Sequence, residues 1–471
     1  MTIDQAHLSS SPPTRAVLRR ATIGATVGSI VEWFDIAVYS YLAVIIGKVF
    51  FATSDPTVSL LASFAVFGVA FIVRPLGGIF FGTLGDRIGR KKTLVAVLIL
   101  VAAATFGIGL LPGHASIGVA APLLLVLLRL VQGFSAGGEM GGASAFVAEY
   151  APPRRRGFFV SLVEMGCILG FLLGSLAVLL LNLWLSNQQM LDWGWRLPFL
   201  MAAPLGMIGL YIRSKLEETP EFLALQAEGN LSENPFKETL TKHWPAVLRT
   251  AGFALFQNAA LYIILSFIPA YLTTNLGYPS SLASMSPVMT MVFVCITIPL
   301  AGALSDRVGR KRVLGASCLL AILLSYPLFV LMDLNTPSLA ILAHVCLGLI
   351  LGIFLGPVLA TMNELFTTRV RYGGFSLGYN LSVSLFGGTA PFLVTLLIAL
   401  TGVKTSPAFY VMAAAFLTLL VIAKSRETAP RLQKESQNVL NSGVGEATRR
   451  CIEPGSAGLL TPTENRASIA D

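Results

Sequence analysis

Long apolar runs alternate with short polar segments along almost the whole chain. A helix of about 20 apolar residues is long enough to cross the hydrocarbon core of a bilayer, and twelve windows of this kind occur in the sequence. We therefore expect an all-α membrane protein with twelve transmembrane helices. The expected spans are 24–48, 58–82, 94–112, 118–145, 158–185 and 195–213, followed by 247–274, 284–304, 313–332, 338–362, 375–400 and 406–424.

The longer polar segments divide the chain into five parts. We expect an N-terminal tail at 1–23, a first six-helix half at 24–213, a central loop at 214–246, a second six-helix half at 247–424 and a C-terminal tail at 425–471. The central loop is long enough to let the halves move relative to each other. The C-terminal tail is rich in Ser, Gly, Thr and Glu, so we expect it to lack a stable core.

Composition and charge placement support this membrane assignment. Of all residues, 55% are hydrophobic and only 12% are charged, whereas soluble domains carry roughly a quarter charged residues. The sequence has no G-x4-G-K-[ST] phosphate loop, which argues against a nucleotide-driven pump. We expect no enzyme activity, no catalytic residues, no metal site and no cofactor.

The net charge of +9 comes from basic residues that gather in alternate loops. The loops on one side hold a single basic residue, Lys404, and those on the other side hold sixteen. An excess of Lys and Arg marks the cytoplasmic side, so we expect an inner-membrane protein with both termini in the cytoplasm. A nucleic-acid partner is not needed to explain the charge, and no obligate protein partner is expected. The sixteen residues lie in the loops at 83–93, 146–157, 214–246, 305–312 and 363–373.

A charged sequence occurs twice along the chain. The stretch at 82–92, Gly-Thr-Leu-Gly-Asp-Arg-Ile-Gly-Arg-Lys-Lys, recurs 220 residues later at 302–312 as Gly-Ala-Leu-Ser-Asp-Arg-Val-Gly-Arg-Lys-Arg. Two further pairs have similar offsets: a Glu followed by arginines at 149–156 and 364–371, and acidic span ends at 217–220 and 427–430. The chain therefore consists of two copies of one membrane module.

The paired sequences resemble the signature of the major facilitator superfamily of transporters. The resemblance implies two halves that rock about a substrate site near the bilayer midplane. It also implies that the charged residues form a cytoplasmic network which stabilises the outward-open state. The alternative is that the Lys and Arg residues only set the topology. The residues of this gating motif are Gly82, Asp86, Arg87, Gly89, Arg90, Asp306, Arg307, Gly309 and Arg310.

Further motifs lie in and beside the expected spans. They are Val-Glu-Trp-Phe-Asp at 31–35, Arg-Pro-Leu-Gly-Gly at 74–78, Gln-Gly-Phe-Ser-Ala-Gly-Gly-Glu at 132–139, Phe-Val-Ala-Glu-Tyr at 146–150 and Gly-Trp-Arg-Leu-Pro-Phe at 194–199. These motifs resemble the metabolite:proton symporter branch and, within it, the proline/glycine-betaine osmoprotectant permeases. That resemblance implies import of a small zwitterionic osmolyte with a proton. The alternatives are a proton-coupled importer of an anionic metabolite, such as citrate, 2-oxoglutarate or shikimate, and a transporter-like sensor.

Ionisable residues inside the expected spans are the candidate sites of coupling, because charges at membrane depth are costly and usually functional. They are concentrated in the first half, whereas the second half offers mainly neutral polar and aromatic residues. We therefore expect proton coupling in the first half, with sodium as the alternative ion. The proton-coupling candidates are Asp35, Glu32, Arg129, Glu139 and Glu164.

Glu32 and Asp35 are three residues apart and share one helical face. Two carboxylates at low dielectric cannot both ionise freely, so one of them can hold a proton. We rank Asp35 first because it lies deeper in its span. The alternative is a structural ion pair of either acid with Arg74 or Arg129.

The substrate candidates follow from the chemistry of a zwitterion. An arginine suits a carboxylate, and aromatic rings can enclose a quaternary ammonium through cation–π contact. Neutral polar residues of the second half would complete the site. The candidates are Arg74, Gln132, Trp33, Tyr39, Gln257, Asn258, Tyr262 and Asn380.

Overall fold

The computed structural model describes residues 15–51, 56–229 and 235–430. Within this part of the chain, twelve helical segments are long and apolar enough to cross a membrane. The expected all-α fold with twelve spans is therefore confirmed. Most of the expected N- and C-terminal tails lies outside the described residues.

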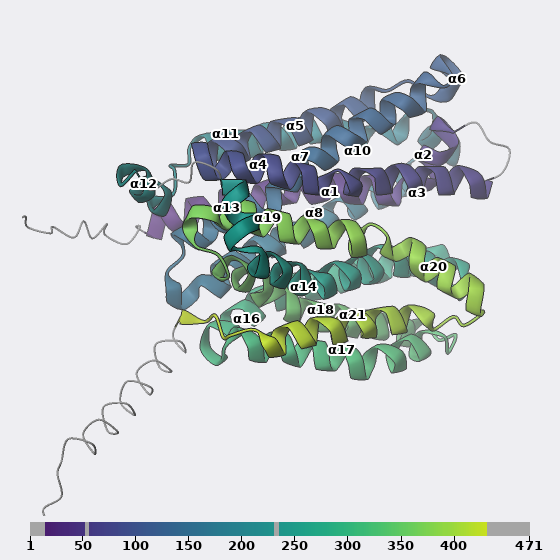
Figure 1. Cartoon of the computed structure of the whole chain (residues 1–471). Helices are drawn as coiled ribbons and strands as arrows, with labels where there is room; N and C mark the ends of the chain where they lie inside the picture. The colour runs from purple at the N-terminus through teal and green to yellow at the C-terminus, as the bar shows by residue number, and fades with distance from the viewer. Residues whose placement is uncertain (1–14, 52–55, 230–234, 431–471) are drawn as a thin grey trace, which may run out of the picture.

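The first half forms one bundle, drawn in purple to blue in Figure 1. Several of its spans are broken into consecutive helices. Its helices are α1 (Arg15–Tyr41), α2 (Ala43–Phe50), α3 (Pro56–Ile72), α4 (Arg74–Ile88), α5 (Arg90–Leu110), α6 (His114–Ile117), α7 (Ala120–Tyr150), η1 (Pro153–Arg155), α8 (Arg156–Trp184), α9 (Asn187–Gln189), η2 (Met190–Gly194), α10 (Arg196–Leu200) and α11 (Ala202–Ser214).

Two short helices, α12 (Pro220–Ala227) and α13 (Pro235–Lys242), occupy the central loop. The second half forms the other bundle, drawn in green to yellow in Figure 1. Its helices are α14 (Trp244–Leu261), η3 (Tyr262–Phe267), α15 (Ile268–Thr274), α16 (Ser280–Val308), α17 (Arg310–Met332), α18 (Pro337–Glu364), η4 (Thr368–Val370), α19 (Arg371–Ser382), η5 (Val383–Gly387), α20 (Ala390–Thr401) and α21 (Ser406–Lys424).

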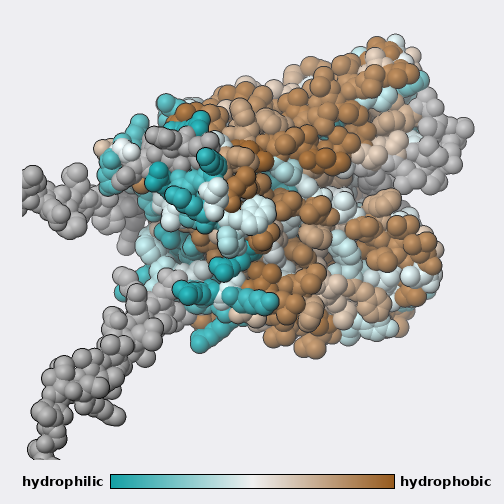
Figure 2. Space-filling view, viewed as in Figure 1, coloured by the Kyte–Doolittle hydropathy of each residue, from teal (hydrophilic) through white to brown (hydrophobic). Residues whose placement is uncertain are grey.

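The two bundles lie side by side and meet along two seams. In one seam α8 packs on α16 and α18, and in the other α19 packs on α4 and α7. Figure 2 shows apolar residues covering the sides of both bundles and polar residues gathered at one end. We call this the charged end; it contains α12, α13 and the repeated hairpins. The end at α6 and α20 is the opposite end.

The repeated sequence forms the same hairpin in both halves. The expected loops at 83–93 and 305–312 were too long, because the helices run to Ile88 and Val308 and restart after one residue. That residue is Gly89 in the first half (φ 108°, ψ 155°) and Gly309 in the second (φ 107°, ψ 149°). Side chains other than glycine rarely adopt this conformation, so each sharp reversal depends on its glycine.

An acidic residue from the end of each half caps the helix that follows the hairpin. Glu218 accepts hydrogen bonds from the backbone N–H groups of Arg90 (3.0 Å) and Lys91 (3.1 Å). Glu427 does the same for Arg310 (2.9 Å) and Lys311 (3.1 Å). A carboxylate at a helix N-terminus satisfies free N–H groups and interacts favourably with the helix dipole. This contact explains why the acidic span ends recur in both halves.

Replacing Gly89 with alanine is expected to destabilise the protein by about 1–3 kcal/mol, the usual cost of a non-glycine residue in such a backbone conformation. The new Cβ would also lie 2.2 Å from Oε2 of Glu218. Thermal unfolding in detergent measures the effect. The matched control is Gly68→Ala, because a Cβ at Gly68 meets no atom within 4 Å. Equal melting temperatures for the two variants would refute this account of the hairpin.

Glycines also let α3 and α4 pack backbone to backbone against α7. A Cβ at Gly77 would lie 1.7 Å from the carbonyl oxygen of Phe134, and one at Gly133 would lie 1.9 Å from that of Ala70. Small residues permit such close approach of membrane helices. The contact brings Arg74, at the start of α4, close to the core of the first half.

Candidate functional site

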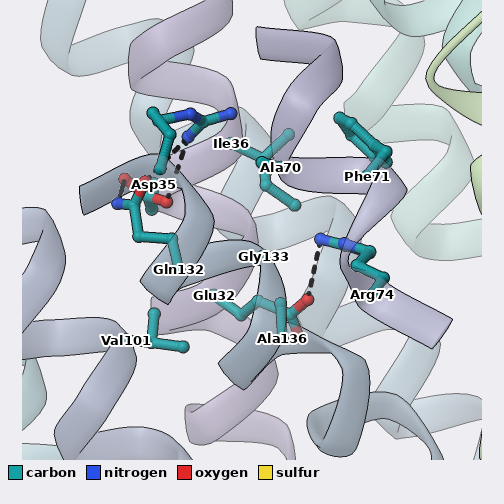
Figure 3. Close-up of a pocket in the computed structure, with 11 residues that line it drawn as sticks. Glu32, Asp35, Ile36, Ala70, Phe71, Arg74, Val101, Gln132, Gly133 and Ala136 are labelled. Carbon is teal, nitrogen blue, oxygen red and sulfur yellow. Dashed lines mark hydrogen bonds and ion pairs between the residues drawn. The ribbon is translucent and has the colours of Figure 1, made fainter. Parts of the chain in front are cut away.

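Two buried ion pairs link α1 to its neighbours in the first half. Glu32 pairs with Arg74 of α4 at 3.2 Å, and Asp35, nearly one turn further along α1, pairs with Arg129 of α7 at 3.8 Å. All four side chains are buried. Figure 3 shows Arg74 directed toward Glu32 on one side of a cavity, with Asp35 on the other side. Each carboxylate thus has its own cation, as the structural alternative in the sequence analysis foresaw.

Asp35 and Arg129 are joined by a network of neutral side chains. Gln132 donates to Asp35 and to the hydroxyl of Thr105, each at 2.8 Å, and accepts from Arg129 at 3.0 Å. The guanidinium of Arg129 also lies 4.2 Å from the centre of the Tyr39 ring. All five residues belong to the first half. Gln132 and Tyr39, both expected to contact substrate, therefore hold Asp35 and Arg129 in place here.

A third buried pair lies nearer the charged end. Glu139 of α7 forms an ion pair with Arg213 of α11, and both side chains are buried. A Cβ at Gly28, one turn before Glu32 on α1, would clash with both partners. Three buried acids therefore lie in a row along one face of α1: Glu139 beside Gly28, then Glu32, then Asp35. Arg213 was missed in the sequence analysis because it stands at the last position of its expected span, where a basic residue usually sets topology.

A small cavity lies between the two pairs on α1. Its volume is about 20 Å³, which is enough for about one water molecule. It is too small for an amino acid, so a substrate needs the halves to rearrange. The residues that line it are Glu32, Asp35, Ile36, Ala70, Phe71, Arg74, Val101, Arg129, Gln132, Gly133 and Ala136.

Glu164 of α8 differs from the other buried acids of the first half. Its Oε1 accepts a hydrogen bond from Gln257 of α14 at 3.0 Å, and its Oε2 has no partner. Among the described residues no cation lies within ion-pair distance of this carboxylate. It is fully buried, and its carboxylate interacts electrostatically with the like-charged carboxylate of Glu32. Glu164 therefore links the two halves through a neutral partner only.

Aromatic rings from both halves meet beside the Glu32–Arg74 pair. Trp33 stacks on Tyr262 of η3, with ring centres 6.3 Å apart and planes at 29°. Phe71 meets Tyr262 edge to face at 5.4 Å, and the guanidinium of Arg74 lies 4.8 Å from the centre of the Phe71 ring. We call Trp33, Phe71 and Tyr262 the aromatic cluster.

Several buried polar atoms around this cluster have no hydrogen-bond partner among the residues that the structure describes. Buried polar groups in proteins are nearly always paired, so a concentration of unpaired ones marks a place suited to a polar ligand. The atoms come from both halves, as a site between rocking halves requires. They are Oε2 of Glu32, Nε1 of Trp33, Nε of Arg74, Oε2 of Glu164, Oε1 of Gln257 and the hydroxyls of Tyr262 and Tyr379.

The two asparagines expected to bind substrate have different surroundings. Asn258 donates to the carbonyl of Ala254 in its own helix at 2.9 Å, and its Oδ1 is unpaired. Asn380 donates across the seam to the carbonyl of Gly137 at 2.7 Å. Asn380 thus ties α19 to α7, and the Oδ1 atoms of both asparagines lack a hydrogen-bond partner among the described residues.

The gating aspartates join the halves at the charged end. Asp86 pairs with Arg90 at 3.1 Å and accepts the N–H of Gly373, in the first turn of α19, at 2.9 Å. Asp306 pairs with Arg310 at 2.8 Å and accepts the N–H groups at the start of α8, those of residues 157 and 158, at 2.9 Å each. Each half thus caps a helix of the other half. The side chains of Arg87 and Arg307, by contrast, are exposed.

An ion-pair network beside these contacts also crosses between the halves. Arg371 of α19 pairs with Glu149 of α7 at 3.2 Å and with Glu221 of α12 at 2.9 Å. Glu221 also accepts from the hydroxyl of Thr368 at 2.6 Å. The expected linker therefore contributes to the contact, and the charged end is closed.

Contacts near the opposite end are fewer. The hydroxyl of Tyr41 donates to the carbonyl of Leu265 at 3.3 Å, and the hydroxyls of Ser40 and Ser266 are 3.1 Å apart. Figure 2 shows a notch between the two bundles at the opposite end. The candidate site is thus closed on both sides, with the thicker barrier at the charged end.

Comparison with known proteins agrees with this architecture. Residues 25–391 match the model of the Major Facilitator Superfamily. The chain is 40% identical to the proline/betaine transporter of Escherichia coli K12 over 93% of this chain and 89% of that one. It is also 40% identical to the glycine betaine/proline/ectoine/pipecolic acid transporter of Dickeya dadantii, over 88% of this chain and 84% of that one.

Solved structures support the fold. A proton:xylose symporter of the major facilitator superfamily, bound to 6-bromo-6-deoxy-D-glucose, superposes with a TM-score of 0.75. The match covers 88% of this chain and 97% of the other. Because the sequence identity is only 17%, this match supports the fold alone. From the family match and the close relatives, this chain belongs to the major facilitator superfamily and, within it, to the family of proline/betaine transporters.

Proposed function

We propose that this protein imports a small zwitterionic osmolyte, of the proline or glycine betaine type, together with a proton by alternating access. The observation that carries the proposal is the charge balance of the buried first-half site. Three arginines, at 74, 129 and 213, face four acids, at 32, 35, 139 and 164. One proton makes this site neutral, and Glu164 is the acid without a cation.

A neutral site suits a zwitterion better than an anion. An anionic metabolite such as citrate would add negative charge where every arginine is already paired with a carboxylate. A zwitterion adds no net charge and can use both signs, with its carboxylate near Arg74 and its ammonium near the aromatic cluster and Glu164. The names of the relatives at 40% identity support the same substrate class.

The basic loops and the gating contacts indicate how the protein is oriented in the membrane and which conformational state the structure shows. Basic loop residues gather at the charged end, so this end faces the cytoplasm under the positive-inside rule. Both termini would then be cytoplasmic, in a bacterial-type inner membrane. Closure at the charged end makes the structure an occluded or outward-facing state, which opens inward when the contacts of Asp86 and Asp306 break. The complete gating motif disfavours a sensor that binds ligand without translocation.

Proton movement would use the acids of the first half. Glu32 interacts electrostatically with Asp35, Glu139 and Glu164, so a proton on one acid changes the charge felt by the others. Protonation of Glu164 would remove the unpaired charge that faces Gln257, and the halves could then separate at this level. Asp35 and Glu139 lie on either side of Glu32 along α1, so their charges would influence whether Glu32 holds a proton.

Uptake into proteoliposomes tests the substrate assignment. Purified protein would be offered labelled glycine betaine, proline and citrate, with an inside-alkaline pH gradient. We expect uptake of the two zwitterions, mutual competition between them and no competition by citrate. Preferred uptake of citrate would overturn the substrate assignment while leaving the fold intact.

Replacing Trp33 with leucine is expected to weaken glycine betaine binding about thirtyfold, and proline binding less. A desolvated cation–π contact is worth about 2 kcal/mol, and 1.4 kcal/mol corresponds to a tenfold change. A trimethylammonium group can make no hydrogen bond in compensation, whereas the ammonium of proline can. Half-saturation constants for uptake measure the effect, with Trp33→Phe as the control that keeps a ring. Equal losses for both substrates would contradict the aromatic assignment.

A further inference from the structure

The seventh span contains a π-helix where it meets α1. In η3, residues 262–267, the wider turn disrupts the usual i to i−4 hydrogen bonds, so backbone carbonyls become available to other donors. Two consecutive carbonyls are used in this way. Nε2 of His344 lies 2.7 Å from the carbonyl oxygen of Ile264, and the hydroxyl of Tyr41 donates to that of Leu265. Side chains from α18 and α1 thus hold two consecutive carbonyls of one segment.

His344 is fully buried between three elements of the second half. Its Nδ1 lies 2.6 Å from the hydroxyl of Ser286 on α16. A carbonyl can only accept a hydrogen bond, so Nε2 carries the proton that bonds Ile264, and in the neutral ring Nδ1 accepts from Ser286. The ring therefore has one bond to the π-helix and one to α16, and the two bonds can be removed separately.

The π-helix contributes directly to the closure above the candidate site. Its first residue, Tyr262, belongs to the aromatic cluster and stacks on Trp33. Its fifth residue, Ser266, contacts Ser40 of α1. The carbonyl that accepts from His344 lies between these two contacts, so a change at this carbonyl alters both.

We propose that His344 is a positioning residue of the transport cycle, which holds the π-helix η3 so that Tyr262 closes over the substrate and α1 meets the seventh span at the outer side. The inference rests on the proposed function, because it places Tyr262 over the substrate, but the first readout below uses no substrate. His344 itself does not touch the aromatic cluster through any hydrogen bond; it acts through the backbone of Ile264.

Replacing His344 with glutamine or with asparagine distinguishes this positioning role from ordinary packing of the side chain. A glutamine places its side-chain N–H near the position of Nε2, whereas an asparagine reaches only as far as Nδ1. H344Q therefore keeps the bond to Ile264, and H344N keeps only the bond to Ser286. Ser286→Ala removes the hydroxyl at Nδ1 and leaves the π-helix contact, so it serves as the matched control.

The first readout is independent of substrate. Ser266→Cys is introduced into each background, and its labelling by a membrane-impermeant maleimide from outside is followed in vesicles. Reaction of the other cysteines is subtracted with the same variants lacking S266C. We expect labelling in H344N to be about tenfold faster than in the parent, the change that 1.4 kcal/mol produces. H344Q and S286A should label at the parent rate.

The second readout is glycine betaine uptake by the same variants without S266C. We expect H344N to raise the half-saturation constant more than it lowers the maximal rate, and H344Q to restore it. Equal behaviour of H344Q and H344N, or better function of H344N, would overturn the proposal and assign His344 to the packing of α16 on α18.

Should H344N fail to fold, Tyr41→Phe removes the hydrogen bond to the adjacent carbonyl of Leu265. Unchanged labelling in that variant would show that side-chain bonds to these carbonyls do not hold η3, which would also overturn the proposal. A parent protein that takes up no betaine refutes the proposed function and leaves the labelling test valid.

Discussion

Replacing Asp35 with asparagine is expected to abolish proton-driven accumulation of osmolyte while leaving exchange of internal for external substrate. Asparagine keeps the size of the side chain and an acceptor for Gln132, but it cannot carry a proton. It also leaves Arg129 without its carboxylate, and loss of one partner of a buried pair typically costs about 3–5 kcal/mol. Net uptake under an imposed pH gradient, compared with counterflow at equal pH, measures the two activities separately.

Glu164→Gln is expected to give the same separation of activities. Glutamine mimics the protonated, neutral form of the acid and can still accept from Gln257, so the halves can separate at this level but the side chain carries no proton. The matched control is Asp333→Asn, because Asp333 is an exposed acid whose ion pair, within the described part of the chain, is with the exposed Lys404. Full accumulation by Asp35→Asn and Glu164→Gln would exclude both acids as proton carriers.

Replacing Asp306 with alanine is expected to open the charged end. The aspartate accepts two backbone hydrogen bonds from the start of α8 in the other half. Hydrogen bonds to a charged group are worth about 1.5–3 kcal/mol each, and the contacts exist only while this end is closed. The equilibrium should therefore shift toward the inward-open state by at least about a hundredfold, since 1.4 kcal/mol gives a factor of ten.

Distances between spin labels at Lys92 and Arg312, two exposed positions in opposite halves at this end, measure the shift. We expect a longer distance to dominate in Asp306→Ala. Arg307→Ala is the matched control, because Arg307 is the exposed neighbour in the same motif. Identical distance distributions for Asp306→Ala and the parent would show that the aspartate does not stabilise the closed state.

The architecture could be read from the sequence because it depends on local properties. Hydrophobic length predicts each span, and the duplicated hairpin predicts the paired halves. The loop lengths were wrong because charged residues such as Arg90 can remain helical once a carboxylate caps the helix. A single glycine, Gly89, then suffices for the turn.

The pairing of charges could not be read in the same way, because it depends on how helices rotate against one another. Glu139 was expected as a proton-coupling candidate without a named partner, and its partner in the structure is Arg213 from a different span. Gln132 and Tyr39 contact Asp35 and Arg129 within the first half, a pairing that the sequence did not reveal, and their contact with substrate stays a prediction. A backbone feature such as the π-helix at Tyr262 gives no pattern in sequence at all, so the role of His344 emerges only from the structure.

The most direct test of the account is proton movement driven by substrate. Proteoliposomes would carry a trapped pH indicator, and glycine betaine would be added outside without an imposed gradient. We expect the interior to acidify on addition to the parent protein, with one proton per osmolyte, and no acidification with Asp35→Asn. Uptake of betaine without acidification, driven instead by a sodium gradient, would contradict proton coupling through the first-half acids.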